Sequence, residues 1–124
     1  MAIMNDERIS GELLKGHIAT LILAILGDRP RHGYDIMKTV SERTGGVFEL
    51  GQGTIYPLLY GLEEQRLVCS KTKVVAGRRR RVYSLTAAGR KSCRNRKIQW
   101  HLFREAMNSI LEPGYLKGLN HAGL

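Results

Sequence analysis

Arginine is the residue type whose spacing in this sequence points most directly to chemistry. Four arginines are consecutive, Arg78, Arg79, Arg80 and Arg81, and the surrounding residues 65–100 hold twelve Lys and Arg but no Asp or Glu. A guanidinium bonds phosphate through two parallel hydrogen bonds, or inserts into a narrow DNA minor groove. This one-signed charge predicts a polyanionic partner: nucleic acid, or as the weaker alternative an anionic membrane surface. A solvated basic face without a partner is the remaining interpretation.

The other reactive residue types form no catalytic or metal-binding set. The four histidines lack the spacing of metal ligands, and Cys69 and Cys93 form neither a disulfide framework nor a CxxC pair. Gly51 and Gly53 follow no clear strand, which predicts a turn rather than a nucleotide-binding loop. We therefore expect a protein that is not an enzyme and that uses no metal and no cofactor.

Composition indicates one small globular domain with an arm. The chain has 124 residues, 43% of them hydrophobic, and a formal net charge of +9 from 20 Lys and Arg against 11 Asp and Glu. The longest apolar run, residues 18–26, has about half the length of the roughly 20 residues that a membrane span needs. Residues 1–10 lack the apolar stretch of a secretory signal. These features predict a cytoplasmic protein, located at the nucleoid if it binds DNA, with no membrane partner.

Three short helices are predicted in the first half of the chain. Apolar residues at helical spacing predict a first helix over residues 12–26, ended by Gly27 and Pro30, and a second over residues 33–43. A third begins near Thr54, whose hydroxyl can cap it, because Pro57 is tolerated in a first turn. One face of this helix is apolar and the other carries polar and aromatic residues: Ile55, Leu58, Leu59 and Leu62 against Thr54, Tyr56, Pro57, Tyr60, Gly61 and Glu64.

A hairpin and a long helix complete the chain. Alternating residues predict strands over 67–75 and 79–85, separated by Ala76 and Gly77. Thr86 is expected to cap a final helix over residues 87–111, in which Gly89 allows close approach to the hairpin backbone. Along this helix, the apolar residues repeat at intervals of 3, 4 and 3, the spacing of a helix-on-helix seam: Trp100, Phe103, Met107 and Ile110.

The order of these elements predicts a mainly α fold of the winged helix-turn-helix layout. We expect a DNA-binding domain over residues 1–86 with a two-stranded β wing, a dimerisation helix over residues 87–112, and a tail over residues 113–124. In this layout the third helix enters the DNA major groove and the wing contacts the flanking backbone. The DNA-binding residues that this layout predicts lie on the second and third helices and the wing: Lys38, Gln52, Thr54, Tyr56 and Arg78, Arg79, Arg80 and Arg81.

Several segments together resemble the PadR family of bacterial transcriptional regulators. They are His32-Gly33-Tyr34-Asp35-Ile36, Gly53-Thr54-Ile55-Tyr56-Pro57-Leu58-Leu59, Gly77-Arg78-Arg79-Arg80, and Tyr83-Ser84-Leu85-Thr86-Ala87-Ala88-Gly89. The resemblance covers residues 12–111, and the single C-terminal helix resembles the smaller subfamily. It implies a homodimeric repressor whose last helix crosses to the partner subunit. It also implies that Tyr34 and Tyr56 contact the DNA backbone and that Gln52 and Thr54 reach the groove.

The resemblance further implies an effector site at Trp100, where aromatic-drug sensors of this family sandwich a flat ligand in the dimer interface. Arg96 and Arg104 lie one turn to either side of Trp100, and no carboxylate is close on that helix face. A pocket here is therefore expected to prefer a neutral or anionic aromatic compound. Plain dimer packing is the alternative for Trp100, and helix packing the alternative for Tyr34 and Tyr60.

Two other functions remain open. A non-specific nucleoid-associated or architectural protein would use the same basic wing, and would bind operator and shuffled DNA equally. An adaptor that binds protein through its winged helix is disfavoured by the basic stretch.

Overall fold

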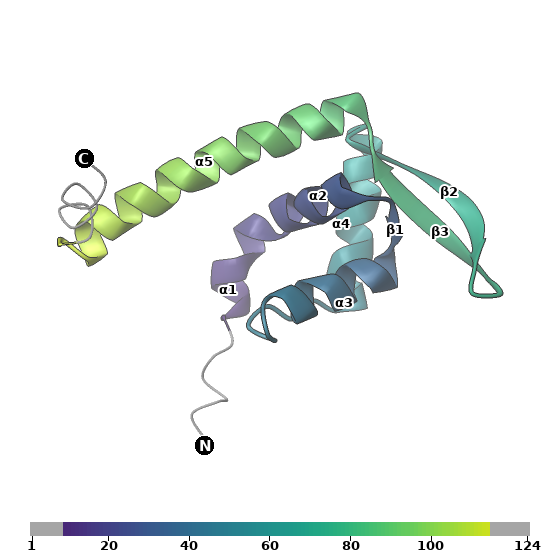
Figure 1. Ribbon diagram of the computed structural model, residues 1–124, viewed down its shortest axis with the longest axis horizontal. Helices are drawn as coiled ribbons and strands as arrows, with labels where there is room; N and C mark the ends of the chain where they lie inside the picture. Colours follow the sequence, from purple (N-terminus) through teal and green to yellow (C-terminus); the bar gives the residue numbers. More distant parts are fainter. Residues whose placement is uncertain (1–8, 115–124) are drawn as a thin grey trace, which may run out of the picture. The chain divides into compact units, whose positions relative to one another are not determined.

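The computed structural model describes residues 9–114, which belong to two units, Met1–Cys93 and Arg94–Leu124. The first unit contains every element up to the opening turns of the last helix (Figure 1). The second contains the remainder of that helix. The predicted tail lies outside the described residues from Tyr115 onward.

The first predicted helix is divided in the structure. It consists of α1 (Gly11–Leu14), a 3-10 turn η2 (Lys15–His17) and α2 (Ile18–Asp28). Gly27 lies inside α2, so the expectation that it ends the helix is wrong. The helix ends at Asp28 because Arg29, with φ −170° and ψ 162°, is extended, the conformation that a following proline favours.

Helix α3 (Gly33–Arg43) has the predicted bounds, whereas α4 (Gln52–Glu64) begins earlier than expected. Gly51 is its N-cap residue, and the amides of Thr54 and Ile55 donate to the Gly51 carbonyl at 3.1 and 3.0 Å. Thr54 is therefore not the cap. Pro57 lies inside the helix rather than in its first turn, and leaves the Gly53 carbonyl without an amide of α4. Gly53 is exposed, so water can satisfy that carbonyl.

The wing consists of β2 (Val68–Val75) and β3 (Arg78–Leu85), which pair antiparallel. Ala76 and Gly77 both have positive φ, 51° and 79°, as a type I′ hairpin turn requires. A short strand β1 (Arg31–His32) also pairs with β3, so the sheet has three strands in the order β1-β3-β2. The predicted wing had two strands, because a two-residue strand carries no detectable alternation.

The core lies between the helices of the first unit and the inner face of the sheet. Ile22 and Leu23 of α2, Ile36 of α3, and Ile55 and Leu59 of α4 are fully buried. The predicted apolar face of α4 is confirmed, with Leu62 also buried and Leu58 partly buried. Its other face is exposed apart from Gly61, which leaves that face of α4 available to solvent.

Helix α5 (Ala87–Leu111) begins at a junction with the end of α4 and the start of β2. The Thr86 hydroxyl accepts from the Gly89 amide at 3.0 Å and donates to the Arg66 carbonyl at 2.7 Å. The predicted cap is thus confirmed. A Cβ on Gly89 would overlap the Leu67 carbonyl oxygen, which confirms the close approach expected of this glycine.

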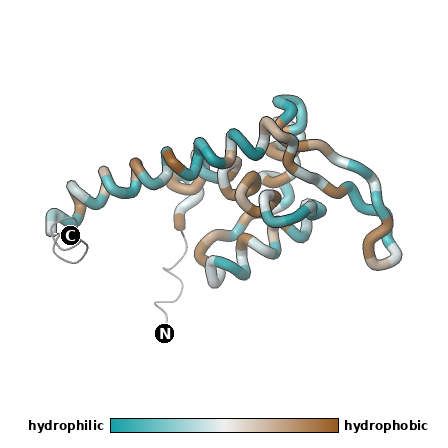
Figure 2. The backbone as a smooth tube through the Cα atoms, turned by 45° about the horizontal axis from the view of Figure 1, so that its top comes forward, coloured by the Kyte–Doolittle hydropathy of each residue, from teal (hydrophilic) through white to brown (hydrophobic). Residues whose placement is uncertain are grey.

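The second unit carries the predicted seam on a single helix. Apolar and polar residues alternate along α5 (Figure 2), and the seam side chains are substantially exposed: Trp100 43%, Phe103 47%, Met107 42% and Ile110 78%. Within residues 9–114, every helix is too short or too polar to cross a lipid bilayer.

Candidate nucleic-acid interface

The start of α3 is held by an imidazole. His32 precedes the helix, and its Nδ1 accepts a hydrogen bond from the Asp35 amide at 3.2 Å, which is the geometry of an N-cap. Burial lowers the pKa of His32 below 6.5; Arg80 and Arg29 lower it further, and Asp35 opposes them. The ring is therefore kept neutral, the form in which Nδ1 can accept a hydrogen bond.

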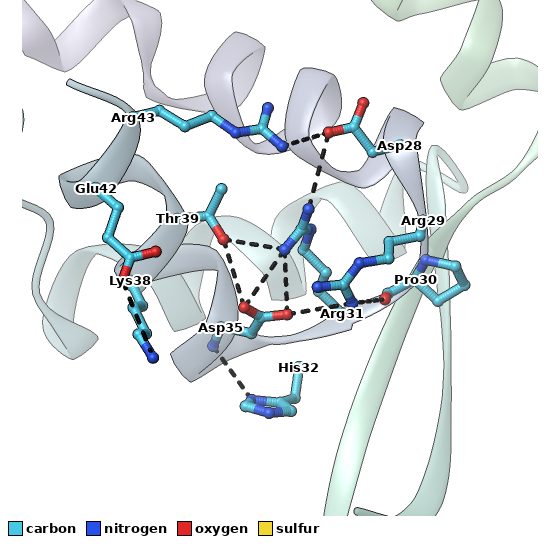
Figure 3. A network of polar contacts seen from close by, with 10 residues as sticks. All are labelled: Asp28, Arg29, Pro30, Arg31, His32, Asp35, Lys38, Thr39, Glu42 and Arg43. Carbon is cyan, nitrogen blue, oxygen red and sulfur yellow. Dashed lines mark hydrogen bonds and ion pairs between the residues drawn. The ribbon is translucent and has the colours of Figure 1, made fainter.

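Beneath this cap lies a buried guanidinium (Figure 3). Arg31 Nη1 donates to the Thr39 hydroxyl at 3.0 Å and pairs with Asp35 Oδ2 at 3.3 Å. Arg31 Nη2 lies 3.8 Å from Asp28 Oδ2, which also accepts from Arg43 at 2.6 Å. These contacts fasten β1 to the end of α2 and to α3, the first helix of the helix-turn-helix.

Tyr56 is positioned by a glycine rather than only by its own helix. A Cβ on Gly33 would come within 2.6 Å of the Tyr56 phenol oxygen, so this ring crosses the start of α3. Tyr56 nevertheless remains 39% exposed. It therefore packs between α3 and α4 and presents one side to solvent.

The other predicted contacts of the helices lie on the same unit. Gln52 and Thr54 are exposed in the first turn of α4. Tyr34 is 54% exposed in the first turn of α3, with its ring stacked at 6.4 Å from the His32 ring. Lys38 is exposed one turn further along, and its Nζ lies 4.0 Å from Glu42 Oε2. Because this ion pair is exposed and therefore weak, the Lys38 ammonium remains able to bind a phosphate.

The four wing arginines are divided between the two faces of β3. Successive side chains of a strand point to opposite faces, and the pairing of His32 with Val82 places Arg80 on the His32 side. Arg81 lies on the other face, where it lines an open groove with Tyr56. Arg78, Arg79 and Arg81 are exposed and Arg80 is half-buried. The wing therefore presents cations in two directions, with Arg80 on the side of His32 and Arg81 on the side of Tyr56.

The candidate effector residues lie on α5. The Trp100 and Phe103 rings are 5.8 Å apart and tilted by 33°, and Arg96 and Arg104 flank Trp100 along the helix. Arg104 Nη2 lies 3.3 Å from Glu105 Oε2. This exposed pair joins sequence neighbours, and Glu105, five positions after Trp100, lies on a different side of the helix from that ring.

Sequence reasoning missed the Arg31 cluster, the β1 strand and the polar contacts of Glu63. Arg31, Asp35 and Thr39 are spaced by four, which predicts contacts on one helix face, but nothing in that spacing indicates burial. Glu63 Oε2 accepts from the Ser70 hydroxyl at 2.6 Å, a contact between a helix end and a strand with no local pattern. Among residues 9–114, no group of three or more His, Cys, Asp or Glu is placed to hold a metal.

The fold and these exposed side chains define the class: a DNA-binding protein of the winged helix-turn-helix type. Residues 22–95 match the transcriptional regulator PadR-like family. The chain belongs to this family of DNA-binding transcription regulators.

Individual relatives agree with that assignment. The chain is 35% identical over 97 residues to the transcriptional regulator Rv3488 of Mycobacterium tuberculosis, covering 77% of this chain and 88% of that protein. It is also similar to a PadR family transcription regulator from Clostridium difficile, with a TM-score of 0.70 and 34% identity over 77% of this chain and 98% of that one. A PadR family regulator from Eggerthella lenta has a TM-score of 0.71 and 29% identity, covering 82% and 87%.

The capping role of His32 predicts a pH-dependent stability. Because the pKa of His32 is lower in the folded chain, the unfolded chain binds this proton more tightly, and the free energy of unfolding should fall as the pH drops below 6.5 and through the lower folded pKa. Loss of the cap is worth on the order of 1 kcal/mol. Denaturant titrations between pH 7.5 and 5 measure this. His32→Asn keeps a capping acceptor without a titrating group, so its profile should be flatter; an equal slope in both proteins would contradict this role.

Proposed function

We propose that the protein binds a pseudo-palindromic operator as a homodimer and represses transcription. The observation that carries the proposal is the arrangement in the first unit. One folded unit contains both the exposed first turn of α4, with Gln52 and Thr54, and the arginines of the wing. Tyr56 of α4 packs against the start of α3 and lines one groove with Arg81 of the wing. A helix N-terminus with polar side chains suits base edges, and cations beside it suit phosphates.

Each subunit would place α4 in a major groove, with the two half-sites about 34–36 Å apart. The amides at the start of α4 favour a phosphate. Tyr34, Lys38 and the wing would hold the flanking backbone, and the contacts of Gln52, Thr54 and Tyr56 would supply the sequence preference. Repression follows if the occupied operator overlaps a promoter.

The wing contribution is tested by fluorescence anisotropy on the protein's own upstream DNA and on a shuffled duplex, across a salt series. The wild type should prefer the upstream DNA by ~10³-fold or more. The double variant Arg79→Ala/Arg80→Ala should bind both duplexes more weakly. The slope of log K against log salt should fall in magnitude by roughly 1.8 if each arginine neutralises one phosphate. Lys15→Ala, an exposed lysine of η2, is the control and should leave the slope unchanged.

An unchanged slope in the double variant would remove the wing from the contact surface. Equal affinity for the two duplexes would favour the second candidate function, a non-specific nucleoid-associated protein, which the cationic wing also suits. Transcription from the upstream promoter in a purified system then separates repression from activation.

The dimer is proposed to form along the exposed seam of α5. Phe103→Asp buries a carboxylate in such a seam and should dissociate the dimer, raising its dissociation constant by at least tenfold in sedimentation experiments over a concentration series. Leu102→Asp is the matched control, because Leu102 is similarly exposed but off the seam by one helix position. Equal dissociation by both variants would show that the interface is not the seam.

A ligand response is proposed at Trp100. Arg96 and Arg104 favour a neutral or anionic aromatic effector, and such a compound shifts the protein only through its differential affinity for the state that does not bind DNA. Quenching of Trp100, the single tryptophan, should therefore respond to a phenolate at lower concentration than to a cationic dye. Tight binding of the dye alone would overturn the proposed preference.

A further inference from the structure

An open groove of about 530 Å³ lies in the first unit between α4 and the sheet. It is lined by Tyr56, Tyr60, Glu63, Glu64, Arg81 and Tyr83. Three of these six side chains are phenols and two are carboxylates. This composition is unusual in a chain of net charge +9, and the proposed contacts with DNA use only Tyr56 and Arg81.

Tyr83 presents a polar atom with no partner to this groove. The residue is only 6% exposed, and within residues 9–114 no hydrogen bond to its hydroxyl is formed. Burial raises the pKa of Tyr83 above 10; Arg81 opposes this, while Glu63 and Tyr56 raise it further. The hydroxyl therefore stays protonated, next to a carboxylate and a second phenol, and is available to a ligand.

Glu63 is oriented toward the same space by a fixed contact. The Ser70 hydroxyl donates to its Oε2 at 2.6 Å, and Ser70 is the β2 residue that pairs with Tyr83. Within residues 9–114, no hydrogen bond or ion pair engages Glu63 Oε1, which stays available as an acceptor. Glu64 follows directly, and Arg81 is the one cation of the lining, so the groove has one more negative than positive side chain.

These groups together select the charge of an occupant. Aromatic faces attract organic cations, and a carboxylate beside them adds a direct charge interaction. Phosphate is disfavoured, because Glu63 and Glu64 repel it. We propose that the groove binds an organic cation of the aromatic ammonium class, and that this binding competes with DNA because both ligands would contact Tyr56. This site differs from the one proposed at Trp100 in its residues and in the charge it prefers.

The binding is tested by isothermal titration calorimetry with benzyltrimethylammonium, and with benzoate and benzyl alcohol as the anionic and neutral probes. The wild type should bind the cation at least tenfold more tightly than either comparison compound. Glu63→Gln should weaken cation binding at least tenfold, and Tyr83→Phe should weaken it less. Glu42→Gln removes an exposed carboxylate outside the groove and should have no effect. Circular dichroism checks that each variant is folded.

Three outcomes would overturn the site. They are equal binding of the three probes, an equal loss in Glu42→Gln and Glu63→Gln, and loss of cation binding in Trp100→Phe, which would place the cation on α5. If Tyr83→Phe fails to fold, Glu64→Gln is measured in its place and should lower the affinity for the cation. An unchanged affinity in Glu64→Gln would overturn the contribution of Glu64 to the groove.

Competition with DNA rests on the proposed function and is measured separately, by anisotropy at constant ionic strength. Benzyltrimethylammonium chloride should weaken DNA binding by the wild type and not by Glu63→Gln, while sodium benzoate has no such effect. Cation binding without any effect on DNA affinity would overturn the competition. Absence of DNA binding by the untreated protein would instead overturn the proposed function, and the calorimetry would still decide the groove.

Discussion

The buried guanidinium of Arg31 is the interaction on which the arrangement of α2, α3 and the sheet depends. It joins the end of α2, through Asp28, to α3, through Asp35 and Thr39. The backbone of the same residue pairs with Tyr83 of β3. One residue thus ties α2 and α3 to the base of the wing. Removing one partner of a buried ion pair typically destabilises by about 3–5 kcal/mol, because the remaining charge is left uncompensated.

How much the sequence predicts depends on the range of the interaction. The bounds of α3 and α5, the Thr86 cap and the apolar face of α4 all follow from local periodicity, and the structure confirms them. The end of α4 does not follow from local periodicity. Arg66 adopts a left-handed φ of 61° there, at a position where glycine would be the usual sequence signal for the end of a helix. The backbone around Arg66 is held by a hydrogen bond from the Leu67 amide to the Leu62 carbonyl, at 2.9 Å.

The candidate site divides in the same way. Exposure of Gln52, Thr54 and three of the four wing arginines could be predicted, since polar residues beside an apolar stripe face solvent, whereas Arg80 is half-buried. The contact of Tyr56 with Gly33 could not, because it joins two helices whose crossing no local pattern specifies. For the same reason, no local sequence pattern indicated the hydrogen bond between Glu63 and Ser70. The missed contacts are therefore the ones between elements, and they decide which of the exposed residues lie close together.

The alternation of the wing arginines constrains how related wings can differ in length. The turn at Ala76 and Gly77 meets no other part of the described chain at the glycine position, so the hairpin can lengthen at its tip. Adding one residue to each strand extends the reach by about 3.4 Å and preserves the pairing of all residues below. A single insertion within β3, in contrast, would exchange the faces of Arg80 and Arg81. Insertions near the tip thus preserve these faces when they come in pairs, and an odd insertion at the base reverses which face of the wing carries Arg80 and which carries Arg81.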